Sequence, residues 1–178
     1  MADLPNWQLN GQWAIVTGGT KGIGKAIVDQ LLQFGTQVIS ISRSPVQEEE
    51  KNSQAIYLYA DLSLPEGITA ALKQIEAHTS RIDILVNNVG MNIRKAASHY
   101  EETEIEHILN TNLLSAVRLN LAVYPQLKAS KNGCIIHVSS VAGIVHVRSG
   151  FVYGLTKGAM NQMTRNLAAE WAPDGIRV

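Results

Sequence analysis

The chain has 178 residues, which is enough for one domain with a substantial core. Hydrophobic residues make up 46% and charged residues 17%, a balance typical of a globular protein rather than a disordered one. Lysine and arginine together number 15, as do aspartate and glutamate, so the formal net charge is zero. Proteins that bind nucleic acid or a membrane surface usually carry a basic excess, so the composition argues against both classes.

Cysteine usage and the first residues indicate the compartment. Cys134 is the only cysteine, so an internal disulfide is impossible, which fits a reducing environment. The start, Met-Ala-Asp-Leu-Pro-Asn-Trp, lacks the basic residues and long apolar run of a signal peptide. No stretch approaches the roughly 20 apolar residues of a membrane span. We therefore expect a cytoplasmic protein with no membrane segment.

Apolar runs alternate with segments of helical periodicity along the chain. In chain order, we expect a strand at Gln12–Val16, a helix at Lys25–Phe34, strands at Gln37–Ile41 and Ala55–Ala60, a helix at Pro65–Ala77, a strand at Asp83–Val86, a helix at Thr103–Lys128, a strand at Gly133–Val138, a helix at about Gly150–Trp171 and the start of a strand at Ile176–Val178. Continuous apolar strands joined by helices are typical of a parallel sheet covered on both faces. The sequence thus predicts an α/β fold, a three-layer, doubly wound Rossmann-type sheet, over residues 1–178.

A glycine-rich turn, Thr17-Gly18-Gly19-Thr20-Lys21-Gly22-Ile23-Gly24, joins the first strand to the first helix. Glycines there let a pyrophosphate approach the backbone, and the helix N-terminus offers it unpaired N–H groups. The spacing differs from the G-x-G-x-x-G fingerprint, so a purely structural turn is the alternative. The position after the first strand favours a nucleotide site formed by Gly18, Thr20, Lys21, Gly22, Ile23 and Gly24.

The end of the second strand points to one nicotinamide cofactor over the other. An NAD site usually has Asp or Glu here, where it binds the ribose hydroxyls. This chain instead has Ser42 and Arg43, with Arg43 19 residues beyond Gly24. Arg43 and Lys21 could together pair with a 2′-phosphate. We therefore expect NADP (NADPH), the alternative being two ordinary surface cations.

Polar residues also follow the third and fourth strands. Asp61-Leu62 could accept a hydrogen bond from an adenine amino group, or Asp61 could cap the next turn. Asn87-Asn88-Val89-Gly90 could tie neighbouring strands together and leave room for the adenosine. We assign Asp61, Leu62, Asn88 and Gly90 to the cofactor site; a purely structural role for the asparagines is the alternative.

Tyr153 and Lys157 are spaced so that both side chains fall on one helical face. A free tyrosine, with a pKa near about 10, is a poor acid–base group at neutral pH. A nearby ammonium favours the phenolate, so such a tyrosine can give a proton to a carbonyl oxygen or take one from an alcohol. Ser140, 13 residues earlier at a strand end, could hold the substrate oxygen against Tyr153.

The same spacing occurs in Tyr124 and Lys128. Tyr124 has Thr111 rather than a serine 13 residues before it. It also comes late in a long helical segment, where we expect Pro125 to disturb the backbone. We therefore interpret Tyr124 and Lys128 as structural residues.

Taken together, the motifs resemble those of the short-chain dehydrogenase/reductase family, and tropinone-reductase-like members most closely. The matching segments are residues 17–24, Asn-Asn-Val-Gly at 87–90, Asn-Thr-Asn-Leu at 110–113, Val-Ser-Ser-Val-Ala-Gly at 138–143, the Tyr153–Lys157 pair and residues 173–178. The resemblance implies an oxidoreductase that transfers a hydride between NADP(H) and a carbonyl or secondary alcohol. It also implies a homodimer or homotetramer through the helices beginning near Thr103 and Tyr153.

The resemblance further implies a catalytic set of Asn112, Ser140, Tyr153 and Lys157. Asn112 would bind a water in a proton relay, and Lys157 would hold the nicotinamide ribose as well as favour the phenolate of Tyr153. Tyr153, like Lys157, would also contact the cofactor. Residues 138–140 would lie alongside the nicotinamide ring.

Other polar residues receive weaker assignments. No two histidines stand at helical spacing with a carboxylate beside them, so we expect no metal site. His137 is interpreted as a packed strand residue. His146, between Ser140 and Tyr153, could line the substrate pocket or face solvent. Asn92, Ile93 and Arg94 could border the substrate.

Family members usually run to about 250 residues, whereas this chain stops as a predicted strand begins. A stop at this point would leave an apolar sheet edge exposed, and such edges are prone to aggregation. We therefore expect a fragment that lacks C-terminal strands and a substrate lid, the alternative being that the protein ends here. The substrate's identity lies beyond the sequence. The alternative to an enzyme is a nucleotide-binding module without catalysis of its own.

Overall fold

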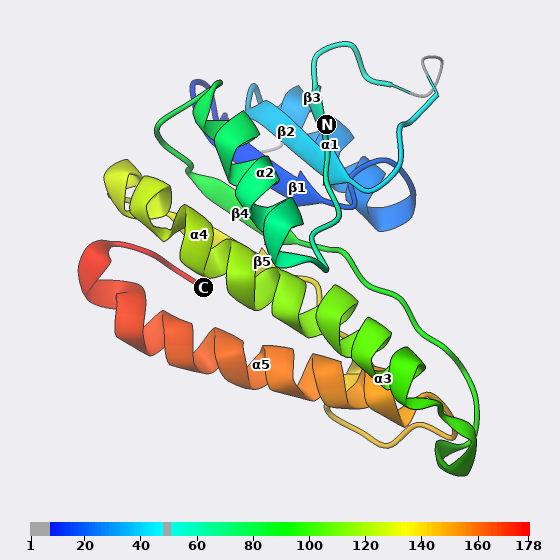
Figure 1. Cartoon of the computed structure of the whole chain (residues 1–178). Coiled ribbons are helices and arrows are strands. Elements are labelled where there is room, and N and C mark those ends of the chain that lie inside the picture. The colour runs from blue at the N-terminus through cyan, green and yellow to red at the C-terminus, as the bar shows by residue number, and fades with distance from the viewer. Residues whose placement is uncertain (1–7, 48–50) are drawn as a thin grey trace, which may run out of the picture.

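The computed structural model describes residues 8–47 and 51–178, and its centre is a five-stranded parallel sheet in the order β3-β2-β1-β4-β5 (Figure 1). The elements are β1 (Trp13–Thr17), α1 (Gly22–Gln33), β2 (Gln37–Ser42), β3 (Ile56–Tyr59), α2 (Pro65–Glu76), β4 (Ile84–Asn87), η2 (Ala97–His99), α3 (Glu102–Leu109), η3 (Asn110–Leu114), α4 (Ser115–Ser130), β5 (Cys134–His137), η4 (Val141–Gly143), α5 (Phe151–Trp171) and η5 (Ala172–Asp174). The predicted α/β architecture is confirmed.

Helices cover both faces of the sheet, as predicted. One core cluster joins the sheet to α2, α4 and α5, with fully buried Ile15 and Leu85 meeting Ile75 and Leu119. A second, smaller cluster packs Val28 and neighbouring residues of α1 against the opposite face. The apolar strands are buried on both sides because each face has its own helical layer. Among the described residues, no helix is both long enough and apolar enough to cross a membrane.

The strand order fixes where a ligand can bind. β1 pairs with β2 on one side and with β4 on the other, so the chain winds outward in both directions from β1. In an open parallel sheet, the crevice lies at such a reversal, outside the carboxyl ends of the strands. The predicted site residues follow these strand ends.

The helix expected over Thr103–Lys128 differs from the structure in two respects. It consists of α3, a π-helical turn at η3 and then α4, which continues to Ser130. Pro125 lies inside α4 and does not end it. A proline costs a helix one hydrogen bond, and burial of the adjacent Val123 and Leu127 in the core offsets that loss. At the chain's end, Arg177 forms a parallel bridge to Cys134 beside β5.

Candidate active site

A cleft of about 1050 Å³ runs along the carboxyl edge of the sheet, from the start of α1 to the start of α5. It brings together most of the predicted site residues: Gly18, Thr20, Lys21, Ile23, Gly24, Ser42, Arg43, Asp61, Leu62, Asn88, Gly90, Ser140, Tyr153 and Lys157. Gly22 and Asn112 do not line it. Six segments that are distant in sequence therefore converge on one cleft, and five of them follow strand ends, as the pattern predicts.

The glycine turn needs glycine at specific positions. Gly18 and Gly22 have left-handed φ angles of +68° and +56°. A Cβ on Gly24 would lie 2.1 Å from the Gly18 carbonyl oxygen, so only glycine fits there without a shift of the backbone. The turn thus folds tightly over the first residues of α1 and exposes its backbone to the cleft.

The N-terminus of α1 is suited to a phosphate. Its N-cap is Lys21, and no side chain forms a cap hydrogen bond there. The first N–H groups of a helix lack partners within the helix and bear a partial positive charge. Thr111 Oγ1, buried at the cleft, likewise has no hydrogen-bond partner in the described part of the chain. These donors fit a phosphate-bearing dinucleotide cofactor.

Asn88 ties the ends of β1 and β4 together. Its Nδ2 donates to the carbonyl oxygens of Thr17 at 2.9 Å and Gly18 at 3.3 Å. Thr17 Oγ1 in turn accepts the backbone N–H groups of Asn88 and Val89 at 2.9 and 3.1 Å. The predicted strand-tying role of the amide is confirmed, and Asn88 also lines the cleft. Sequence reasoning missed Thr17, whose hydroxyl completes the junction.

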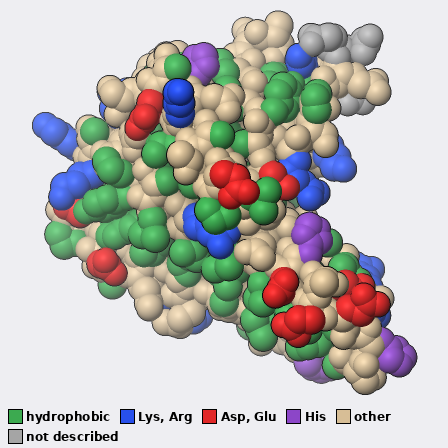
Figure 2. Space-filling view, in the orientation of Figure 1, with side chains coloured by type: hydrophobic (Ala, Val, Ile, Leu, Met, Phe, Trp, Pro, Cys, Tyr) green, Lys and Arg blue, Asp and Glu red, His purple; other side chains and the backbone are tan. Residues whose placement is uncertain are grey.

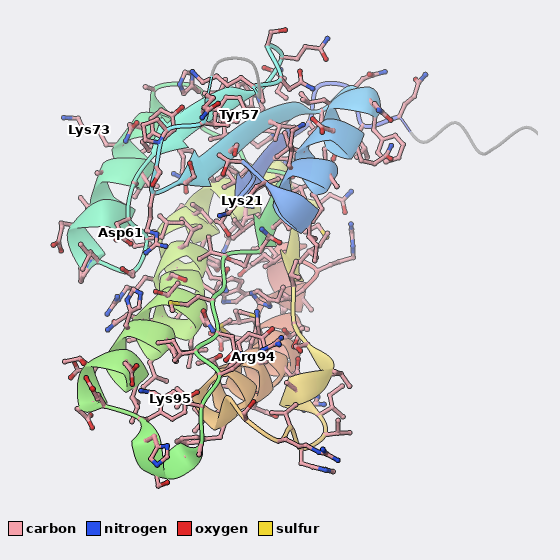
Figure 3. The ribbon with its side chains drawn as sticks, turned by 90° about the vertical axis from the view of Figure 1, so that its right-hand side faces the viewer. Lys21, Tyr57, Asp61, Lys73, Arg94 and Lys95 are labelled. Atoms are coloured by element: carbon pink, nitrogen blue, oxygen red, sulfur yellow. The ribbon has the colours of Figure 1, made fainter. Side chains whose placement is uncertain are left out.

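Asp61 and Arg43 lie at the end of the cleft nearest β2 and β3. Asp61 Oδ1 accepts from the Ser63 backbone at 3.0 Å and from its hydroxyl at 2.6 Å. Burial by itself raises the pKa of Asp61, but the Ser63 hydrogen bonds and the charge of Arg43 outweigh it and leave the pKa below its usual value. Asp61 therefore caps the next turn as an anion and also faces the cleft. Figure 3 shows Asp61 and Lys21 on different elements of this half of the molecule.

Tyr153 and Lys157 occupy the first two turns of α5 and face the other end of the cleft. Lys157 is 3% exposed, and its Nζ donates to the Val138 carbonyl at 2.6 Å. The ammonium lies 5.8 Å from the centre of the Tyr153 ring. Burial lowers the pKa of Lys157. The structure therefore places a desolvated cation beside the phenol.

Serines at the end of β5 complete this part of the cleft. Ser140 Oγ accepts the Ala142 N–H at 3.2 Å and caps the short η4 turn. Ser139 Oγ donates to Asn161 Oδ1 at 2.5 Å, and Asn161 Nδ2 donates to the Gly143 carbonyl at 3.3 Å. Ser139 and Asn161 thereby anchor the segment that carries Ser140 to α5. Because Asn161 belongs to the next helix, no local pattern identified its role.

Asn112 lies behind the cleft and is fully buried. A Cβ on Gly90 would lie 3.6 Å from Lys157 Nζ and 3.8 Å from Asn112 Oδ1, so Gly90 leaves the space between them open. Asn112 bonds both backbone groups of Met91, and its Nδ2 also donates to Thr156 Oγ1 at 3.3 Å. The structure brings Asn112 next to the cleft lysine without exposing it. Sequence reasoning missed Thr156.

The second tyrosine–lysine pair is held elsewhere. Tyr124 Oη donates to Asp174 Oδ2 at 2.5 Å, and Lys128 Nζ pairs with Asp174 Oδ1 at 2.7 Å. The hydrogen bond to Asp174 raises the pKa of Tyr124, whereas an acid–base tyrosine needs its phenolate favoured. Neither residue lines the cleft. The structural interpretation of this pair is confirmed.

His137 and His146 lie in different surroundings, and neither lines the cleft. His137 lies in a buried polar chain: Asn120 Nδ2 donates to its Nε2 at 3.0 Å, and its Nδ1 donates to Thr164 Oγ1 at 2.8 Å. Burial first, and the charge of Lys157 second, lower its pKa to about 4. His146 is exposed and does not line the cleft, and neither does Ile93, whereas Asn92 and Arg94 do. No cluster of metal ligands occurs among the described residues.

The model of the short chain dehydrogenase family matches residues 12–178, and the chain belongs to this family. It is 44% identical to a tropinone reductase homolog of Arabidopsis thaliana, with 96% of this chain and 68% of that protein covered. It is 41% identical to senescence-associated protein 13 of the same plant, with 99% of this chain and 69% of that protein covered. The resemblance to tropinone-reductase-like members is thereby confirmed.

Solved structures share the fold closely. L-sorbose reductase from Gluconobacter frateurii, complexed with NADPH and L-sorbose, superposes with a TM-score of 0.92 at 26% identity, covering 97% of this chain and 69% of that one. RhlG from Pseudomonas aeruginosa, in an NADP active-site complex, gives a TM-score of 0.89 at 30% identity, covering 98% and 73%. The chain is thus an oxidoreductase by family.

Proposed function

We propose that this chain catalyses hydride transfer between NADP(H) and a carbonyl or secondary alcohol. The observation that carries the proposal is the shared cleft: the uncapped start of α1 lines one end, and Tyr153, Lys157 and Ser140 line the other. A bound nicotinamide ring would supply or accept the hydride. The remaining work, which is to hold the substrate oxygen and move its proton, falls to the chain's own residues.

Tyr153 acts as the general acid in reduction and as the general base in oxidation. Its phenol gives a proton to the developing alkoxide in reduction, and its phenolate removes one from the alcohol in oxidation. Ser140 Oγ holds the same oxygen by a hydrogen bond. The buried ammonium of Lys157 would stabilise negative charge that develops on the Tyr153 oxygen, because opposite charges attract strongly where water is excluded. Asn112 serves as a positioning residue that holds Met91 and Thr156 beside this group and lies next to Lys157 at the back of the cleft.

The preference for NADP rests on the cations at the other end. Lys21 and Arg43 both line the cleft, and both are exposed and able to reach a 2′-phosphate. The NADPH and NADP in the two neighbouring structures are consistent with this choice. Gly18, Thr20, Ile23 and Gly24 border the pyrophosphate, and Gly22 shapes the turn. Ser42, Asp61, Leu62 and Asn88 border the adenosine half, and Gly90 borders the cofactor beside Lys157.

Assembly and location extend the proposal. Leu121 on α4 and Leu155 on α5 are 61% and 54% exposed, which supports a homodimer or homotetramer through the helices near Thr103 and Tyr153. The neutral charge and single cysteine support a cytoplasmic protein.

A cofactor titration combined with a turnover assay tests the proposal. We expect saturable NADPH binding and NADPH oxidation with members of a panel of ketones, together with the reverse reaction for the matching secondary alcohols. NADPH binding without turnover of any ketone or alcohol would instead identify a nucleotide-binding module.

A further inference from the structure

Two arginines line the cleft near Tyr153, beyond the residues assigned to the cofactor. Arg94 follows the β4 end and Arg148 precedes α5, and both are exposed. Figure 3 shows Arg94 well away from Lys21 at the start of α1. A phosphate at the glycine turn therefore has its own cations and does not account for this second group.

The backbone around Arg94 is fixed from both sides. Tyr100 Oη donates to the Ile93 carbonyl, and the Gly150 N–H donates to the Lys95 carbonyl at 3.3 Å. The Tyr100 ring packs edge-on against Phe151 at 5.2 Å, with Lys95 Nζ 5.5 Å from its centre. Arg94 thus extends from a segment that is anchored to the N-terminus of the helix carrying Tyr153.

The hydrogen bond between Gly150 and Lys95 also brings the loop of Arg148 close to the segment that carries Arg94. Arg148 lies two residues before Gly150, whose N–H bonds the residue after Arg94. Gly150 has a left-handed φ of +78°, and a Cβ there would lie 2.7 Å from Asn92 Oδ1, so the two segments approach closely. The loops that carry the arginines therefore meet at the mouth of the cleft.

Neither arginine is neutralised by a neighbour. No hydrogen bond or ion pair of the Arg94 or Arg148 side chain occurs within residues 8–47 and 51–178, whereas Lys95 pairs with Glu104. Asp61, at the adenosine end, is the one carboxylate among the described residues that line the cleft. Figure 2 shows acidic side chains gathered instead over α3, at the lower right of that face. Two guanidinium groups without a carboxylate partner, on loops that meet at the cleft, can bind an anion.

We infer that the substrate carries an anionic group, a carboxylate or phosphate, at a distance from its reacting carbonyl, and that Arg94 and Arg148 bind it. This inference rests on the proposed function and specifies its substrate class. Apolar Met91 and Val147 also line the cleft and would contact the body of such a substrate. A cationic amine is disfavoured, because two positive charges repel it and no carboxylate among the described cleft residues at this end pairs with it.

A set of isosteric ketones separates the charge from the shape. 4-Acetylbenzoate, 4-acetylphenylphosphonate, neutral 4-acetylbenzamide and the cationic (4-acetylphenyl)trimethylammonium ion are compared by kcat/KM with NADPH and by calorimetric Kd with and without NADP⁺. We expect either anion to exceed the amide by about tenfold or more in both measures. The benzoate and phosphonate arms show which anion is preferred. The advantage falls as ionic strength rises, because salt screens the charges.

Variants of Arg94 and Arg148 test whether these two residues cause the preference for anionic ketones. In the Arg94→Gln, Arg148→Gln double variant, the anion-to-amide ratio is expected to fall to near one, while the amide's own values stay within about twofold. Arg165→Gln, on the exposed part of α5 and outside the cleft, serves as the control and should preserve the ratio. Equal values for anion and amide, a preference for the cation, or a ratio unchanged in the double variant would overturn the inference. If only the amide were turned over, the proposed function would stand and the inference about the anionic substrate would fail. If no ketone were turned over, the anion-to-amide ratio of Kd values would still test the two arginines.

Discussion

Asn112 and Met91 form a closed pair of hydrogen bonds across 21 residues of sequence: Oδ1 accepts the Met91 N–H at 2.8 Å, and Nδ2 donates to the Met91 carbonyl at 2.8 Å. The π-helical turn η3 sets Asn112 at this position, fully buried, while Thr156 of α5 accepts from the same amide. One side chain therefore joins the exit from β4, the η3 turn and the catalytic helix.

Asn112→Ala should lower the free energy of unfolding by about 2 kcal/mol, because it leaves two partly buried backbone groups of Met91 without partners. The catalytic rate should fall as well, since Met91 and Thr156 flank the reacting centre. Asn110→Ala is the matched control on the same turn, because its exposed hydrogen bond reaches only the Glu106 carbonyl. Urea denaturation and kcat measure both effects. Equal losses in the two variants would contradict the role given to Asn112.

Gly24→Ala should weaken folding and abolish NADPH binding. Its new Cβ would lie 2.1 Å from the Gly18 carbonyl oxygen and 2.5 Å from Asn88 Nδ2, so the turn must move. Overpacking of this kind costs about 1–3 kcal/mol. Gly158→Ala, within α5, is the control, since the nearest atom to its Cβ is the Gly143 carbonyl oxygen at 3.5 Å. NADPH titration and thermal denaturation of both variants test the steric argument, which fails if Gly24→Ala binds NADPH normally.

The buried chain Asn87–Asn120–His137–Thr164 should make stability depend on pH. Burial lowers the pKa of His137 to about 4, against an unfolded value near 6.5. Between these values the unfolded chain binds a proton that the folded chain does not, so stability is lost as pH falls. The free energy of unfolding should decrease by about 1 kcal/mol per pH unit from pH 6.5 to 5.

Urea denaturation across this pH range measures the slope. His137→Asn should flatten it, while His99→Asn, which removes an exposed histidine of η2, should leave it unchanged. Carboxyl groups with lowered pKa values, such as Asp61 and Asp174, titrate below this window and do not confuse the result. An identical slope in wild type and His137→Asn would refute the assignment.

Arg43→Asp should weaken NADPH binding by about tenfold or more and affect NADH less, because a 2′-phosphate loses a cation and gains a repulsive carboxylate. Lys73→Asp makes the same charge change at an exposed position of α2 that does not line the cleft. Figure 3 shows Lys73 far from Lys21. Fluorescence titration with both cofactors gives the ratio of affinities. Equal effects of Arg43→Asp on NADPH and NADH would contradict the NADP assignment.

The sequence sufficed for the alternation of elements and for the strand-end residues, because both follow from local periodicity and from parallel topology. It did not suffice for the break at η3, since a π-helical turn has no distinct apolar pattern. The polar contacts of Thr17 with Asn88 and of Ser139 with Asn161 were also missed. They join residues 71 and 22 positions apart, and only the folded backbone determines such partners.

The proposed catalytic tyrosine also shows what the sequence predicts and what only the structure adds. Helical spacing identified two tyrosine–lysine pairs, and the strand-end serine favoured Tyr153 over Tyr124. The structure adds the physical distinction: Lys157 is buried beside Tyr153 at the cleft, whereas Tyr124 and Lys128 share Asp174 away from it.

The most direct test of the account is kcat/KM for NADPH-dependent ketone reduction by wild type and Tyr153→Phe, with NADPH Kd measured on the same preparations. Loss of the acid–base group should lower kcat/KM by about 10²–10⁴-fold while NADPH Kd and thermal stability change little. Tyr124→Phe, the matched control, should retain activity. Activity unaffected by Tyr153→Phe would contradict the proposed chemistry.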